Sequence, residues 1–120
     1  MSLFSQLGVP ADLIRGLDAL GISTPTPIQE NAIPFLIKNG GDLVAQAQTG
    51  TGKTAAYLIS ILTHQLEVPS PATRKPGAPR ALLVAPTREL AIQIEHDALL
   101  LSQFVKPRIV TVYGLSLIHI

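Results

Sequence analysis

The sequence predicts an α/β domain in which a parallel β-sheet is flanked by helices. Three short apolar runs, at residues 43–45, 81–85 and 109–113, alternate with segments whose apolar residues recur at helical spacing. A glycine-rich loop, residues 48–52, lies between the first run and the helical pattern that follows it. Strands that are joined through helices pair in parallel, and such sheets are covered on both faces. The 120 residues suffice for one small domain.

The composition narrows the class of protein and of site. Only 14% of the residues are charged, against roughly 25% in ordinary globular domains, and 47% are hydrophobic, so general disorder is not expected. The formal charge of +1 provides no global field for a polyanion, so any such site must be local. The absence of cysteine excludes disulfides and Cys-containing zinc sites, and His64, His96 and His119 are too far apart to indicate a metal cluster.

The sequence also bears on the compartment. Residues 1–6 lack the basic and apolar regions of a secretory signal. Between Leu43 and Leu66 the only charged residue is Lys53, but the polar residues around it are unlike a membrane span. We therefore expect a cytoplasmic protein with no membrane partner.

Two helices are predicted before the first apolar run. Residues 10–20 begin with proline, carry apolar residues at helical spacing and are followed by glycine. A second helix should begin after Thr26, which can cap it, and run towards Lys38. Pro27 suits the first helical position, and Pro34 is expected to kink this helix.

Two further helices should each follow an apolar run. Apolar residues at helical spacing come directly after the glycine-rich loop, and residues 88–101 form the helix after the second run. Residues 67–79 contain four prolines and few apolar residues, which predicts a surface connection.

The segment 47–54, AQTGTGKT, has the chemistry of a phosphate-binding loop. Its glycines let backbone N–H groups approach a β-phosphate closely, and the helix behind presents its positive end. Lys53 would hold the β- and γ-phosphates, and the Thr54 hydroxyl would ligate Mg²⁺. The strict GxxxxGK[ST] pattern is not met because its first position is Ala47. The alternative is a structural turn that happens to end in Lys-Thr.

Two other candidates each allow a structural and a functional interpretation. Gln29 can complete a capping box with Thr26, or its carboxamide can recognise adenine by accepting from N6 and donating to N7. Thr87 and Glu89 can simply begin a helix and leave Arg88 solvated. Ligands, however, bind at the carboxyl ends of parallel strands, so Thr87 and Arg88 could contact a nucleic-acid backbone there.

Together these segments resemble the beginning of the first motor domain of DEAD-box ATP-dependent RNA helicases of the bacterial type. Residues 21–29, GISTPTPIQ, resemble the Q motif of that family, and Phe4 lies 17 residues before Gly21, where the family keeps an isolated aromatic residue. Residues 47–54 resemble its first motif, with the leading alanine, and residues 86–91, PTRELA, resemble motif Ia.

The resemblance implies a fold, a reaction and a set of site residues. It implies part of a RecA-like P-loop NTPase domain that binds ATP and Mg²⁺ and works on RNA. Gln29 would read adenine as well as cap its helix, with Phe4 stacking beside the base. The nucleotide-binding set would be Phe4, Gln29, Gln48, Thr49, Gly50, Thr51, Gly52, Lys53 and Thr54. Lys53 and Thr54 would be the catalytic pair, and Pro86, Thr87 and Arg88 would contact RNA.

The sequence also departs from the family. Residues 1–114 are expected to form the N-terminal part of the ATP-binding domain, whereas 115–120 do not match, because Leu115 stands where the family has a second glycine. The Asp-Glu-Ala-Asp and Ser-Ala-Thr segments and the second motor domain are missing from this sequence. We therefore expect weak ATP binding and no unwinding by this chain. The alternatives are a partly folded, non-enzymatic fragment that binds no nucleotide and a P-loop protein of another kind.

Overall fold

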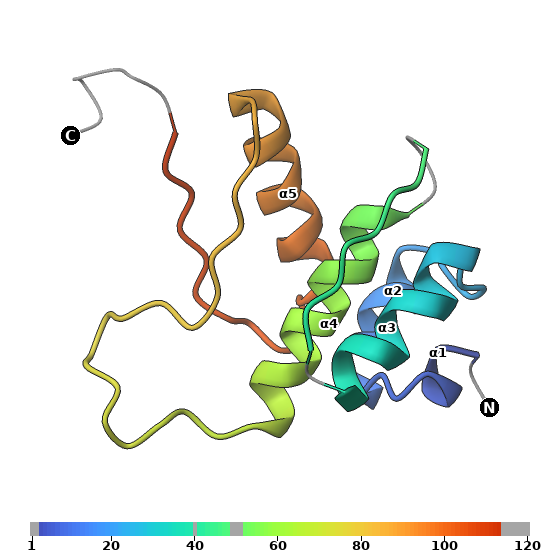
Figure 1. Cartoon of the computed structure of the whole chain (residues 1–120), viewed down its shortest axis with the longest axis horizontal. Coiled ribbons are helices and arrows are strands. Elements are labelled where there is room, and N and C mark those ends of the chain that lie inside the picture. Colours follow the sequence, from blue (N-terminus) through green and yellow to red (C-terminus); the bar gives the residue numbers. More distant parts are fainter. Residues whose placement is uncertain (1–2, 40, 49–51, 114–120) are drawn as a thin grey trace.

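Helices form the ordered framework of the molecule (Figure 1). The computed structural model describes residues 3–39, 41–48 and 52–113. Within these ranges the helices are α1 (Leu3–Gln6), α2 (Ala11–Ala19), α3 (Pro27–Asn39), α4 (Lys53–Glu67) and α5 (Arg88–Leu101).

The structure confirms the predicted helices. The prediction succeeded because strong local signals define the ends of these helices. Pro10 precedes α2, and Pro27 occupies the first position of α3. Pro34 lies inside α3, which continues to Asn39. Helix α5 begins and ends at the predicted residues. The short helix α1 was not predicted, since a single turn has no period that a sequence pattern can show.

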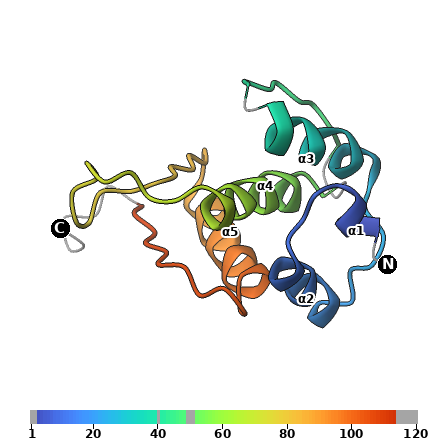
Figure 2. The same ribbon diagram turned by 90° about the horizontal axis from the view of Figure 1, so that it is seen from below.

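Helix α4 lies at the centre of the packing. It contacts α3 along its length and also touches α5 and α2 (Figure 2). These contacts bury one apolar cluster, which supplies the hydrophobic stabilisation of the fold. Its members are Phe4, Val9, Leu13, Leu17, Ala32, Ile33, Ala56, Leu58, Ile59, Leu62, Ile94, Ala98 and Leu101. The core thus joins the phosphate-loop helix to the N-terminal helices.

The three apolar runs predicted as strands follow an extended course, but they are not paired with one another among the described residues (Figure 1). None of the residues 43–45, 81–85 and 109–113 is in a strand. Val44 is 98% exposed, and Leu82 and Val84 are 82% and 85% exposed. A strand needs a hydrogen-bonded neighbour, and local apolar pattern cannot supply one.

The run 109–113 nevertheless has the alternation of a strand. Val110 and Val112 are 84% and 88% exposed, whereas Ile109, Thr111 and Tyr113 are half-buried. Successive side chains of an extended chain point to opposite faces. One face of this run therefore packs against the protein while the other is open, on the side of α5 turned away from α3 (Figures 1 and 2).

Some expectations concern residues that the structure does not describe. Thr49, Gly50 and Thr51 of the phosphate loop lie outside the described residues, and so does the predicted tail, 115–120. In the described part of the chain, no helix is both long and apolar enough to cross a membrane.

Candidate functional site

The phosphate loop leads into the N-terminus of α4. Gly52 is the residue before the helix and has φ +87°, in the left-handed region that glycine adopts without strain. The first intrahelical hydrogen bond runs from the Ala56 N–H to the Gly52 carbonyl oxygen, at 3.0 Å. The N–H groups of the first turn consequently have no acceptor within the helix. No acidic residue lies in that turn, and Lys53 there is exposed, so the local potential favours an anion.

Gln29 connects the start of α3 to this helix terminus. Its side chain is 4% exposed. Its Oε1 accepts from the Thr26 N–H at 3.0 Å, and its Nε2 donates to the Gly52 carbonyl oxygen at 3.2 Å. Half of the predicted capping box is therefore confirmed. The Thr26 hydroxyl is buried and has no hydrogen-bond partner among the described residues.

Gly52 fits so closely against Gln29 that any side chain at this position would displace the Gln29 amide. A Cβ atom at Gly52 would lie 2.3 Å from Gln29 Nε2 and 3.1 Å from Thr26 Oγ1. Real Cβ atoms do not approach neighbours to 2.3 Å, so glycine is favoured both by its backbone angle and by the space that the amide occupies. We call this arrangement the Gln29–Gly52 contact. Sequence reasoning missed it because the two residues are far apart in the chain and no local pattern links them.

Phe4 belongs to the hydrophobic core. The residue lies in α1 and is 1% exposed. Its burial accords with a packing role. Stacking on a base remains a prediction, which requires one face of the ring to become accessible.

The second candidate segment begins α5. The Thr87 Oγ1 accepts from the Leu90 N–H at 3.1 Å, which confirms Thr87 as the helix cap. That bond uses a lone pair of the hydroxyl and leaves its O–H free to donate. Pro86, Thr87 and Arg88 are exposed. The N-termini of α4 and α5 lie at the same end of the molecule (Figure 1), so both segments can face one ligand surface.

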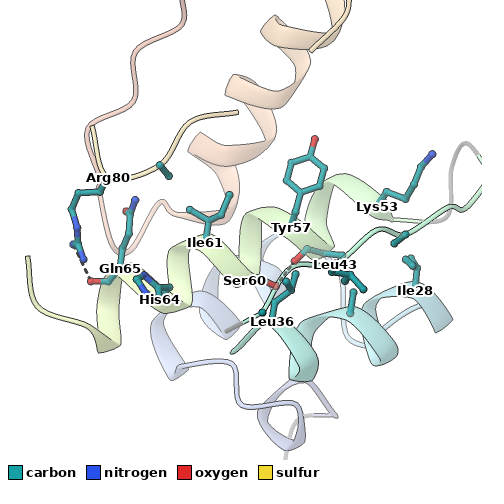
Figure 3. Close-up of a pocket in the computed structure, with 15 residues that line it drawn as sticks. Ile28, Leu36, Leu43, Lys53, Tyr57, Ser60, Ile61, His64, Gln65 and Arg80 are labelled. Atoms are coloured by element: carbon teal, nitrogen blue, oxygen red, sulfur yellow. Dashed lines mark hydrogen bonds between the residues drawn. The ribbon is translucent and has the colours of Figure 1, made fainter. Parts of the chain in front are cut away.

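A hollow of about 640 Å³ lies between α3, α4 and the chain around Ala81. Lys53 lies at one end, and His64, Gln65 and Arg80 lie at the other (Figure 3). Apolar side chains line most of its middle, including Leu36, Leu43 and Ile61. Gln29 and Phe4 are not among its lining residues. Such a surface suits the side chains of a packed sheet better than it suits a triphosphate.

Comparison with known proteins identifies the family to which the chain is similar. The family model of the DEAD/DEAH box helicases matches residues 26–118. The chain is 46% identical over 111 residues to the "ATP-dependent RNA helicase RhlB" of Xanthomonas oryzae, a match that covers 92% of this chain and 19% of that protein. It is 52% identical over 95 residues to the protein of the same name from Aliivibrio fischeri, covering 79% and 22%. The chain thus spans about a fifth of the length of these relatives.

Solved structures of RNA helicases have a fold similar to that of this chain. The RNA helicase Prp28 of Chaetomium thermophilum bound to ADP superimposes with a TM-score of 0.79 at 35% identity, over 94% of this chain and 27% of that one. Dbp5 of S. cerevisiae bound to RNA and ADP BeF3 gives 0.73 at 34% identity, over 88% and 26%. The fold class is therefore α/β, and the molecule is part of a RecA-like domain. Because the family model matches residues 26–118, most of the chain, the chain belongs to the DEAD/DEAH box helicase family.

Proposed function

We propose that this chain is the ATP-binding portion of a cytoplasmic DEAD-box RNA helicase. The parent protein would couple RNA-stimulated ATP hydrolysis to unwinding of RNA duplexes. This chain binds ATP weakly and does not unwind. The observation that carries the proposal is the N-terminus of α4, where Gly52 precedes the helix in a left-handed conformation and its carbonyl accepts a hydrogen bond from the Gln29 amide.

The residues of α4 suit a nucleotide triphosphate. The free N–H groups of the first turn and the Lys53 ammonium supply donors and positive charge for the β- and γ-phosphates. Gln48, Thr49, Gly50, Thr51 and Gly52 would complete the loop with backbone N–H groups. The Thr54 hydroxyl is a suitable oxygen ligand for Mg²⁺, which binds few protein ligands and keeps phosphate and water oxygens as the rest. Bound Mg²⁺ would neutralise charge on the phosphates.

Gln29 retains the capacity to read adenine in addition to its two hydrogen bonds. A primary amide has two N–H donors and two carbonyl lone pairs, and the contacts with Thr26 and Gly52 use one of each. The remaining lone pair and hydrogen match adenine N6 and N7 and mismatch guanine O6. Phe4 would stack beside the base. Because the Gln29 amide is also fixed to Gly52, base and phosphate recognition would share one residue.

Nucleotide binding is tested by titrating the chain with a fluorescent ATP analogue in the presence of Mg²⁺. Lys53→Ala should weaken saturable binding at least about tenfold, because a charge-assisted contact to phosphate is lost. Lys75→Ala is the matched control, since Lys75 is exposed in the connection after α4 and should leave binding unchanged. Binding that is absent, or that Lys53→Ala does not alter, would refute the proposal.

A test of adenine recognition has to separate the loss of the base contact from the loss of the Gln29–Gly52 contact. Gln29→Glu keeps an oxygen for the Thr26 N–H but removes the donor to the Gly52 carbonyl, so it disturbs the loop as well as the base contact. The loop serves ATP and GTP alike, however, so the ratio of the two affinities isolates the base. We expect this ratio to fall towards one in Gln29→Glu. A ratio that stays at the wild-type value would exclude the adenine role.

A non-enzymatic fragment that binds no nucleotide is the second candidate. It is favoured by the exposure of Leu82, Val84, Val110 and Val112, which a completed sheet would cover. Under this alternative the chain either unfolds cooperatively or is partly folded, and in both cases Mg²⁺ and ATP do not change its thermal unfolding. A ligand that binds the native state raises its stability, so the same titration followed by thermal unfolding separates the two candidates.

A further inference from the structure

A cation–π contact joins the two carboxyl-terminal ends of the later apolar runs. The guanidinium carbon of Arg88 lies 5.3 Å from the centre of the Tyr113 ring. This separation is within the roughly 6 Å over which an aromatic face attracts a cation. Arg88 is the first residue of α5 and follows the run 81–85, and Tyr113 ends the run 109–113. The contact therefore lies at the carboxyl ends of two runs that the sequence predicts as parallel strands, and such ends are where parallel sheets bind ligands.

A second contact fixes Tyr113 next to Arg88. The Thr111 hydroxyl donates to the Glu95 carboxylate of α5. Thr111 and Tyr113 are two residues apart in an extended run and share a face, and Arg88 and Glu95 are two helical turns apart and share a face. The two contacts thus pair one edge of the run with one face of α5, and the hydrogen bond sets the register of the ring against the guanidinium.

The contact with the ring leaves the arginine able to bind a phosphate. A guanidinium held over an aromatic face keeps its N–H donors, which lie in its own plane and fit a phosphate in a bidentate manner. A hollow of about 360 Å³ beside the pair is lined by Pro86, Thr87, Arg88 and Tyr113 among others. Thr87 keeps its hydroxyl proton available at the same place, because its oxygen only accepts from Leu90. Thr87 and Arg88 thus both line this hollow, whose other lining residues are mostly apolar.

We propose that Tyr113 is a positioning residue for RNA binding. Its ring holds the Arg88 guanidinium with the N–H donors directed to a phosphate of the RNA strand, while Thr87 donates beside it. Without the ring, Arg88 carries the same charge but loses more rotamer freedom when it binds. The inference rests on the proposed function, because it presupposes that Arg88 and Thr87 contact RNA.

The test measures the affinity of the chain for a fluorescein-labelled oligouridylate by fluorescence anisotropy. Tyr113→Leu should weaken binding about two- to fivefold, the range expected for an exposed cation–π contact. Tyr113→Phe should bind as the wild type does, because it keeps the ring. In an Arg88→Ala background, Tyr113→Leu should have no further effect. Equal weakening in both backgrounds, as general unfolding would produce, overturns the proposal.

Two controls separate positioning from charge and from packing. Arg88→Ala should reduce the slope of log affinity against log salt by about 0.7, because one phosphate contact is lost, whereas Tyr113→Leu should leave that slope unchanged. Phe104→Leu removes the other cation–π contact, in which Arg15 lies 4.2 Å from the ring centre, and should not alter RNA binding. A reduced salt slope in Tyr113→Leu contradicts a positioning role.

The outcomes also distinguish this inference from the proposed function. If the wild-type chain binds the oligouridylate, and Arg88→Ala weakens binding but Tyr113→Leu does not, the positioning role alone is overturned. If the chain binds no RNA while ATP binding depends on Lys53, the RNA contacts of this chain are refuted together with the role of Tyr113. The role of Tyr113 is supported if Tyr113→Leu weakens binding only when Arg88 is present and Tyr113→Phe binds as the wild type does.

Discussion

At the scale of single residues, the candidate site depends on a glycine that meets two separate requirements. Gly52 has a left-handed backbone, and its missing side chain leaves room for the Gln29 amide. Its carbonyl also accepts two hydrogen bonds, one from Gln29 and one from Ala56. A residue usually described as part of a phosphate loop is here also the point at which the first helices of the domain are joined to α4.

Replacing Gly52 should therefore destabilise the fold more than strain alone would. Gly52→Ala incurs about 1–2 kcal/mol for a left-handed alanine and displaces Gln29, whose lost hydrogen bonds add about 1 kcal/mol. Gly77→Ala is the matched control, because Gly77 has φ +82° and nothing within 4 Å of an added Cβ. Urea unfolding should give a larger loss of unfolding free energy for Gly52→Ala. Equal losses would show that the close approach of Gln29 is unimportant.

At the scale of elements, the helix that carries the PTREL segment begins at a clear capping signal. Thr87 is extended, with φ −132° and ψ 156°, and its hydroxyl accepts from Leu90. Glu89 in the first turn adds a favourable charge at the positive end of the helix. The residues that would contact RNA are thus the residues that start α5, so cap and contact are not exclusive interpretations.

The cap should contribute measurably to stability. Thr87→Ala removes the acceptor for the Leu90 N–H and should lower the free energy of unfolding by about 1 kcal/mol. Thr87→Ser retains the acceptor and should differ little from the wild type. Thr73→Ala, in the exposed connection, serves as the control for loss of a surface threonine. Thermal unfolding followed by circular dichroism is the measurement, and a neutral Thr87→Ala would contradict the observed cap.

The packing of α2 on α5 leads to a prediction for Gly16→Ala. Helix propensity and the contact between the two helices should change the free energy of unfolding in opposite directions. A Cβ atom at Gly16 would lie 2.2 Å from the Leu101 carbonyl oxygen. Propensity alone favours Gly16→Ala by about 1 kcal/mol, whereas overpacking against backbone costs about 1–3 kcal/mol. We expect net destabilisation in urea unfolding. Ala19→Gly, at an exposed position of the same helix, should destabilise through propensity only, and a stabilising Gly16→Ala would mean that the two helices separate easily.

At the scale of the whole molecule, the low charged fraction and the exposed apolar runs have a common explanation. A sheet that is buried on both faces needs few charged residues. In the described residues, however, only the inward face of each later run meets the helices, and Leu82, Val84, Val110 and Val112 point outward. This chain spans only about a fifth of the length of its relatives.

The open face should make the chain self-associate. Unpaired extended segments with outward apolar side chains are templates for pairing with another copy. The double variant Val84→Lys and Val112→Lys should lower the weight-average mass in sedimentation velocity at a given concentration. Leu99→Lys, which replaces an exposed leucine on α5, should change it much less. A wild-type chain that sediments as a monomer at all accessible concentrations would refute this prediction.

The sequence by itself determined helices α2 to α5 and the family. Caps, prolines and apolar spacing act over a few residues, so Thr26, Pro27 and Thr87 predicted their elements correctly. The nucleotide and RNA roles of Lys53, Gln29 and Arg88 remain predictions for the experiments above.

Only the tertiary structure decided which partners the site residues have. The contact of Gln29 with the Gly52 carbonyl and that of Arg88 with Tyr113 join segments that are far apart in the chain. The apolar runs show the same limit, because their local pattern predicts strands but pairing requires a neighbour at hydrogen-bonding distance. Local signals specify an element, whereas a contact between elements depends on how the whole chain packs.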